Sequence, residues 1–182
     1  MTPNMCSHLC FRPTEKFSLF ANLGILTVPE DYVHSSQLMS FQKKHRIEFE
    51  GYNCDITDLN FQNPSCVLSP GDRFLVRAHR QVISSTTTSD ECLEFLATLN
   101  SHYTGAQGAS LVFEQKRDQL PKDFRYLSLD VKDRLWEDPR GDHRIPTVVA
   151  GVHGEFYFFL DCLEDTREDF QIVLSFCDVP QI

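Results

Sequence analysis

The sequence predicts a single α+β domain in which a mostly antiparallel sheet packs against two or three helices. Three observations support this fold class. Several short segments alternate apolar and polar residues as strands do, helix start and stop signals occur in the middle of the chain, and turn signals separate the C-terminal strands. A chain of 182 residues can bury a core without a disulfide or a metal. We therefore expect a loose leader at 1–16 and one domain at 17–182.

The first third of the chain predicts strands around one short helix. Residues 17–28 are apolar and form one strand, or two strands that break near Asn22-Leu23-Gly24. A helix start precedes a helix at 32–44. The alternation at 46–52 predicts a half-buried strand, and 53–70 is a polar connection. The residues expected to face inward here are Val33, Leu38, Phe41, Ile47 and Phe49.

A second clear strand begins at Asp72 and carries a row of basic residues. Alternate residues of a strand project to the same side at about 7 Å intervals, so Arg73, Arg77 and His79 face together. In an acidic chain this row is a candidate contact for an anion or an acidic partner. The alternative is an ordinary solvated sheet face. The opposite side of the strand is apolar and carries Phe74, Val76, Ala78 and Val82.

Two helices are expected after this strand. Thr88 and Glu91 have the spacing of a capping box, which predicts a helix at about 90–100. The turn Gly105-Ala106-Gln107-Gly108 interrupts the helical pattern. A second helix then runs from Ala109 to about Gln119, because Pro121 stops it.

The remaining strands are expected to be mostly antiparallel. Predicted strands lie at 124–129, 134–136, 145–150, 155–162 and 170–177. The last two flank an acidic segment, which predicts that they form a hairpin. Their residues at period two should face the core, namely Phe156, Phe158, Leu160, Ile172, Leu174 and Phe176.

A series of short motifs occurs in the C-terminal part of the chain. It comprises the stretch Gly105 to Leu111, Trp136 with Pro139 and Gly141, Ile145-Pro146, and Phe176-Cys177-Asp178. In this series of motifs the chain resembles short uncharacterised bacterial proteins with no assigned function. The resemblance therefore implies no activity, cofactor or site residue.

Composition excludes some partners. The formal net charge of −9 repels phosphate backbones and anionic membranes, so the expected partner is another protein and nucleic acid is disfavoured. The chain has no apolar run of about 20 residues and no stretch of signal-peptide type, which predicts a soluble, cytoplasmic protein without a membrane partner. The seven cysteines are an odd number at irregular spacing, which predicts reduced thiols.

Metal and cofactor signals are weak in the sequence. Cys6, His8 and Cys10 offer three zinc ligands, but their spacing is not that of a zinc knuckle and no second pair follows. We therefore expect no cofactor and no metal, while whether these three residues bind a metal stays open.

The start of the second predicted helix is a candidate anion site. No carboxylate occurs between Gly105 and Glu114, so the free N–H groups and the positive end of the helix dipole lack an acidic partner on that helix. Gln107, Gly108 and Ser110 would contact the ligand, joined by the basic row if that strand lies alongside. The alternative is that water or the preceding loop satisfies these N–H groups.

Two functions follow from these features. The first is a non-catalytic protein-interaction module of soluble intracellular type. The alternative is a small hydrolase or transferase that acts on an anionic substrate bound near the 105–110 turn. A cleft joining Arg77, His79 and Gln107 would favour the enzyme, and a flat exposed aromatic patch would favour the module. The oligomeric state does not follow from the sequence.

Overall fold

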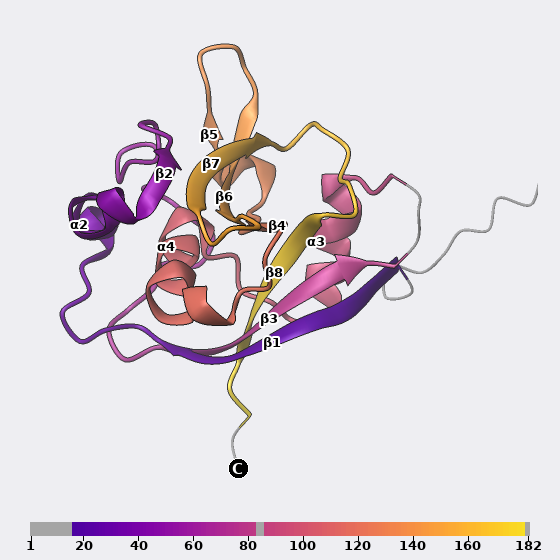
Figure 1. Ribbon diagram of the computed structural model, residues 1–182, viewed down its shortest axis with the longest axis horizontal. Helices are drawn as coiled ribbons and strands as arrows, with labels where there is room; N and C mark the ends of the chain where they lie inside the picture. Colours follow the sequence, from indigo (N-terminus) through magenta and orange to yellow (C-terminus); the bar gives the residue numbers. More distant parts are fainter. Residues whose placement is uncertain (1–15, 83–85, 181–182) are drawn as a thin grey trace, which may run out of the picture.

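The computed structural model describes residues 16–82 and 86–180 and shows one mixed sheet with helices packed on it (Figure 1). This confirms the predicted α+β class with a mostly antiparallel sheet. All of the predicted leader except Lys16 lies outside the described residues. The strands are β1 Phe17–Thr27, β2 Phe49–Tyr52, β3 Arg73–Gln81, β4 Phe124–Leu127, β5 Trp136–Glu137, β6 His143–Ala150, β7 Phe156–Cys162 and β8 Gln171–Asp178. The α-helices are α2 Gln37–His45, α3 Ser89–Thr98 and α4 Gly105–Lys116, and the short 3-10 turns are His34–Ser36, Arg46–Glu48, Arg117–Gln119 and Lys132–Arg134.

The strand order is β1-β3-β8-β4-β6-β7-β2, and β5 pairs with β6 beside this path. Two neighbouring pairs, β4–β8 and β2–β7, are parallel, and the others are antiparallel. The predicted hairpin of the last two strands is wrong, because β4 and β6 lie between β7 and β8. A period of two shows which residues share a face of a strand, but it does not identify the neighbouring strand.

One face of the sheet packs against α2 and α4 and forms the larger core. Phe41 of α2 lies at its centre, with its ring 5.8 Å from the ring of Phe49, 5.7 Å from that of Phe113 and 5.7 Å from that of Phe158. The last two strands face this core as predicted, since Phe158, Ile172, Leu174 and Phe176 are buried and Phe156 and Leu160 pack partly exposed against it.

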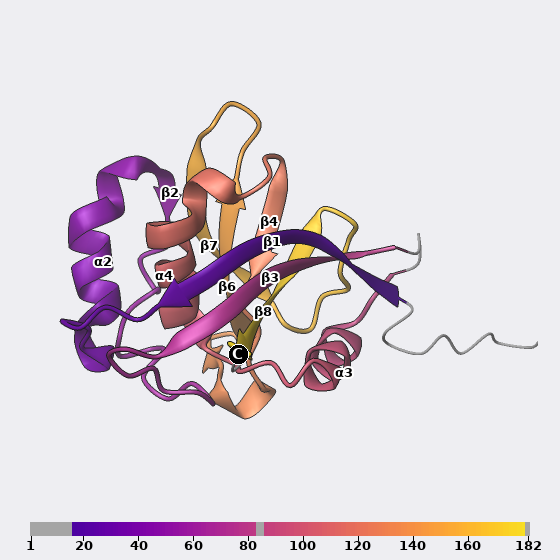
Figure 2. The ribbon, with the colours of Figure 1, turned by 90° about the horizontal axis from the view of Figure 1, so that it is seen from below.

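The other face carries a smaller core under α3. Phe17, Phe95 and Val173 belong to this cluster, and the rings of Phe17 and Phe95 stack with centroids 4.5 Å apart. The predicted capping box is present, because Glu91 N donates to Thr88 Oγ1 at 3.2 Å and Thr88 N donates to the Glu91 carboxylate at 3.0 Å. In Figure 2, α4 and α3 lie on opposite sides of the band formed by β1 and β3.

Three local predictions need correction. The helix expected at 32–44 begins at Gln37, and Val33 is exposed rather than inward-facing. Residues 46–48 form a 3-10 turn after α2 and not the start of a strand, which leaves Ile47 94% exposed. The backbone at 46–48 continues as a helical turn after α2. The alternating apolar and polar residues there therefore do not lie on a pleated strand.

The glycines read as a turn at 105–108 belong to α4 itself. An ideal Cβ at Gly108 would lie 1.8 Å from Thr104 Oγ1, so the glycine provides the space that the Thr104 side chain occupies. Close packing therefore explains Gly108, whereas Gly105 has the left-handed φ of 56° that the turn prediction expected of its glycines. None of the described helices is both long and apolar enough to span a membrane.

Candidate functional site

The predicted basic row on β3 does not form a continuous solvated surface. Arg73 is exposed and Arg77 is half-buried, but α3 covers His79, whose exposed fraction is 5%. The His79 ring lies 5.0 Å from that of Phe95, and its Nε2 is 2.9 Å from Ser175 Oγ. Burial, and then the charge of Arg77, lower the pKa of His79 to about 4. His79 is therefore neutral at pH 7 and adds no positive charge to the row.

The predicted anion-binding residues at the start of α4 are fully buried. Gln107 Nε2 donates to the carbonyl of Phe61 at 2.8 Å. Ser110 Oγ donates to the carbonyl of Gln107 at 2.8 Å and accepts from Gln37 Nε2 at 3.1 Å. Gly108 packs against Thr104. The side chains named for the ligand are thus engaged with the protein itself.

A carboxylate from elsewhere in the chain lies next to this helix start. An ideal Cβ at Gly105 would be 3.9 Å from Asp130 Oδ2, and Asp130 accepts hydrogen bonds from Ser65 N at 2.9 Å and Ser65 Oγ at 2.5 Å. Burial raises the pKa of Asp130, and the hydrogen bonds from Ser65 and Val131 oppose this rise. A carboxyl group thus lies beside the positive end of the α4 dipole, which favours the ionised form of that group.

The two halves of the predicted site lie on different faces of the sheet. Ser175 of β8, which contacts His79, points to the α3 side, whereas Phe176, which packs on Gly108, points to the α4 side. Neighbouring residues of a strand project to opposite faces. The structure therefore does not bring the basic row and Gln107 together in one cleft.

An aromatic surface lies on the β7 side of the sheet, on the face that α3 covers elsewhere. Tyr157 and Phe159 stack there with ring centroids 5.2 Å apart and an interplanar angle of 28°. Phe159 is 38% exposed and Tyr157 is half-buried. An ideal Cβ at Gly51 would lie 2.9 Å from each ring, so the glycine lets both rings rest on the backbone of β2. We call Tyr157 and Phe159 the aromatic pair.

An acidic loop follows the aromatic pair along the chain. Residues 163–170 connect β7 to β8, and the one basic residue among them, Arg167, is 3% exposed. Its Nη2 donates to the carbonyls of Cys162, Leu163 and Asp165. Because this cation points inward, the loop presents carboxylates to the solvent. The exposed acidic residues of the loop are Glu164, Asp165, Glu168 and Asp169.

A cavity of about 330 Å³ lies between α2, α4 and the segment 29–33. The sequence analysis did not predict this cavity, although the polar residues Gln37, Ser40 and Lys44 share one face of α2 at helical spacing. Its lining includes neither the basic row nor Gln107. It comprises Pro29, Asp31, Tyr32, Val33, Ser36, Gln37, Ser40, Phe41, Lys44 and Glu114.

The sequence analysis did not predict the aromatic pair as a surface feature. Alternation along β7 nevertheless places Tyr157 and Phe159 on the side opposite Phe158. The spacing predicted which side of β7 faces the core, but only the tertiary structure shows that the opposite side stays partly exposed at Tyr157 and Phe159. In comparisons with protein-family models, curated proteins and solved structures, no match to the chain was found.

Proposed function

We propose that the chain is a non-catalytic protein-interaction module that binds a basic, partly apolar segment of another protein. The aromatic pair carries this proposal. It is a stacked, partly exposed set of rings on a sheet face that no helix covers at that place among the described residues. Aromatic side chains are frequent anchors of protein interfaces, because they bury a large area with few torsions to restrict.

The acidic loop supports the choice of a basic partner. Its carboxylates begin directly after β7, two residues beyond the strand end at Cys162, and the whole chain has a formal net charge of −9. Complementary charge speeds encounter and selects partners, while apolar contacts supply most of the affinity. A segment with Lys or Arg next to an aliphatic or aromatic residue matches both features.

The enzyme alternative receives no such support. It placed an anionic substrate near the 105–110 turn with help from the basic row, and these residues lie on opposite faces of the sheet. His79 is buried and neutral at pH 7, which removes a cation from the proposed anion site. The geometry therefore favours the module over the hydrolase or transferase.

A reducing compartment such as the cytoplasm fits the proposed function. The five cysteines among the described residues, Cys54, Cys66, Cys92, Cys162 and Cys177, are all free thiols. Free thiols in this number are typical of proteins that remain in a reducing environment.

Selection from a displayed random-peptide library tests the proposal. The full chain is the bait, and the Tyr157→Ser/Phe159→Ser variant is used for counter-selection. We expect enriched peptides that combine Lys or Arg with an apolar residue. Calorimetry should then show binding that weakens by more than about tenfold in the double variant, because a buried aromatic anchor commonly contributes at least that much.

The matched control is Ile47→Ser, since Ile47 is the most exposed large apolar side chain described and lies outside β7. This variant should bind the selected peptides as the parent chain does. Asp165→Asn with Glu168→Gln should weaken binding most at low salt, where exposed charges are least screened. Peptides that bind the double variant equally well, or a library that yields no binder, would contradict the proposal.

A further inference from the structure

We propose that Asp142, Cys162 and Glu164 form a zinc site, which does not involve the aromatic pair and shares only Glu164 with the acidic loop. Each residue offers one ligand atom, and the three atoms lie within 4.8 Å of one another. The antiparallel pairing of β6 and β7 produces this arrangement, because Arg144 lies opposite Cys162 and Leu163 N donates to the carbonyl of His143 at 2.8 Å. The start of β6 and the end of β7 therefore meet here.

The donor set is chemically mixed and suits zinc. Zinc binds thiolates and carboxylate oxygens tetrahedrally at bond lengths of about 2.0–2.3 Å, so two ligand atoms on one ion are roughly 3.5 Å apart. Cys162 Sγ lies 3.3 Å from the Glu164 carboxylate, which is already this spacing. Asp142 needs only a small side-chain movement to join them. Magnesium and calcium are excluded as preferred ions, because they select oxygen ligands and not sulfur.

Cations of the protein neutralise the two carboxylates when no metal is bound. Lys132 Nζ lies 3.2 Å from Glu164 Oε1, but its side chain is 61% exposed and can turn into solvent when zinc binds. Arg144 makes one contact to Asp142 at 3.0 Å and holds Asp138 more closely, through both Nε and Nη2. Arg144 therefore keeps a carboxylate partner after Asp142 turns to the metal.

His143 completes the surroundings of the site. Its Nδ1 lies 2.9 Å from Glu164 Oε1, so the ring orients this carboxylate toward the cluster. Groups that orient metal ligands in this way typically raise metal affinity. Zinc binding breaks the S–H bond of Cys162, forms a zinc–sulfur bond and releases the proton to solvent, so affinity should rise with pH.

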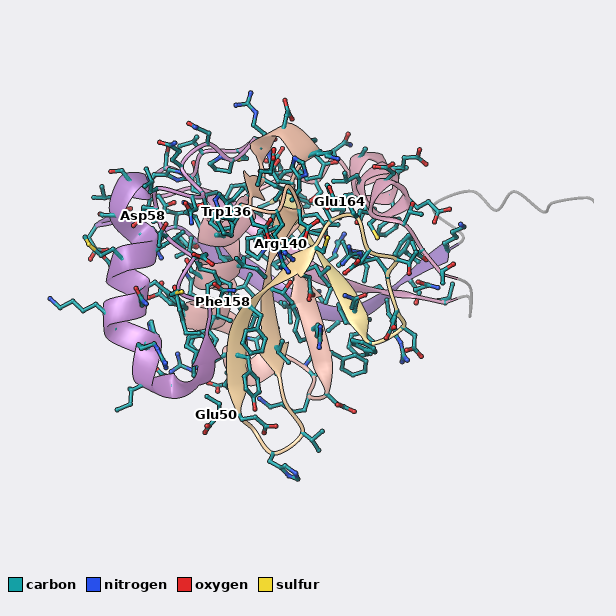
Figure 3. The ribbon with its side chains drawn as sticks, turned by 90° about the horizontal axis from the view of Figure 1, so that it is seen from above. Glu50, Asp58, Trp136, Arg140, Phe158 and Glu164 are labelled. Carbon is teal, nitrogen blue, oxygen red and sulfur yellow. The ribbon has the colours of Figure 1, made fainter. Side chains whose placement is uncertain are left out.

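Glu164 is exposed and Asp142 and Cys162 are half-buried, so a fourth ligand can approach the ion from the solvent side. Three protein ligands with an open fourth position is the arrangement in which zinc binds a water or a side chain of another molecule. Figure 3 shows Glu164 at one end of the β6–β7 hairpin and Glu50 near the other end.

Zinc and cobalt titrations of the full chain test the site. All variants carry Cys6→Ser and Cys10→Ser, because these thiols are candidate ligands in their own right. In this background we expect one zinc per chain in competition with a chromophoric chelator, and a thiolate-to-cobalt absorption band on cobalt addition. Cys162→Ser should abolish the band and weaken zinc binding by more than about tenfold. Cys54→Ser removes an exposed thiol outside the cluster and should change neither readout.

Asp142→Asn provides a second variant that leaves every thiol in place. It should keep the cobalt band but weaken zinc binding, since a neutral amide is a poorer ligand than a carboxylate. Circular dichroism of the zinc-free proteins shows whether each variant folds like its parent. Zinc binding that persists unchanged in folded Cys162→Ser and Asp142→Asn, or that disappears once Cys6 and Cys10 are replaced, would overturn the proposal.

Discussion

At the scale of single residues, His79 shows how burial changes the chemistry expected from sequence. On an exposed strand it would be a titrating cation, but α3 covers it and Ser175 is its hydrogen-bond partner. Desolvation disfavours the charged form of an imidazole, and the neighbouring Arg77 adds to this effect. His79 therefore packs as a neutral ring.

This burial predicts a pH dependence of stability. The pKa of His79 is about 4 in the folded protein and about 6.5 when unfolded. Between these two pH values the unfolded chain binds more protons than the folded chain. The contribution of neutral His79 to the free energy of unfolding is therefore complete above about pH 6.5 and is lost as the pH falls toward 4. The loss should be at most about 3.4 kcal/mol. Urea unfolding from pH 4 to 7 should show a flatter profile for His79→Gln, and profiles that run parallel would contradict the assignment.

At the scale of elements, β7 separates core from surface within neighbouring residues. Phe158 is fully buried among the rings of Phe41, Phe49 and Tyr52. Phe159 projects to the opposite side and is 38% exposed. The same side-chain type thus serves the core on one face and the proposed binding surface on the other.

Alanine substitutions at these two positions should therefore differ strongly. Phe158→Ala removes a buried ring and should lower the free energy of unfolding by about 3–5 kcal/mol. Phe159→Ala should lower it by less than about 1 kcal/mol, because surface substitutions rarely cost more. Chemical denaturation of both variants measures the difference. Equal losses would show that the face carrying Phe159 is also core.

At the scale of the whole molecule, the thiols are distributed between surface and interior without a disulfide among the described residues. Cys54 is exposed, whereas Cys92 is fully buried and burial raises its pKa to about 12. A thiol reacts through its thiolate, so Cys92 should be inert in the folded protein. Reactivity should therefore depend on folding and not on cysteine number alone.

Thiol titration under non-reducing conditions checks this distribution. In denaturant, close to all seven cysteines should react, as expected for a chain without disulfides. In the native protein, Cys54 should react first and Cys92 only at the rate of unfolding. A denatured count of three or fewer would show that disulfides are present, and rapid native labelling of Cys92 would contradict its burial.

The amino-acid sequence by itself determined the features that depend on neighbours along the chain. The capping box of Thr88 and Glu91 and the inward faces of β7 and β8 required only local spacing, and the fold class follows from such patterns. Tertiary structure alone decided which strands are adjacent and which part of the opposite sheet face α3 covers. Insertion of β4 and β6 between β7 and β8, burial of His79 under α3, and the meeting of Asp142 with Cys162 all arise from pairing between distant segments. A strand's period of two specifies its two faces and leaves its partners open, so these contacts appear only when the sheet is assembled.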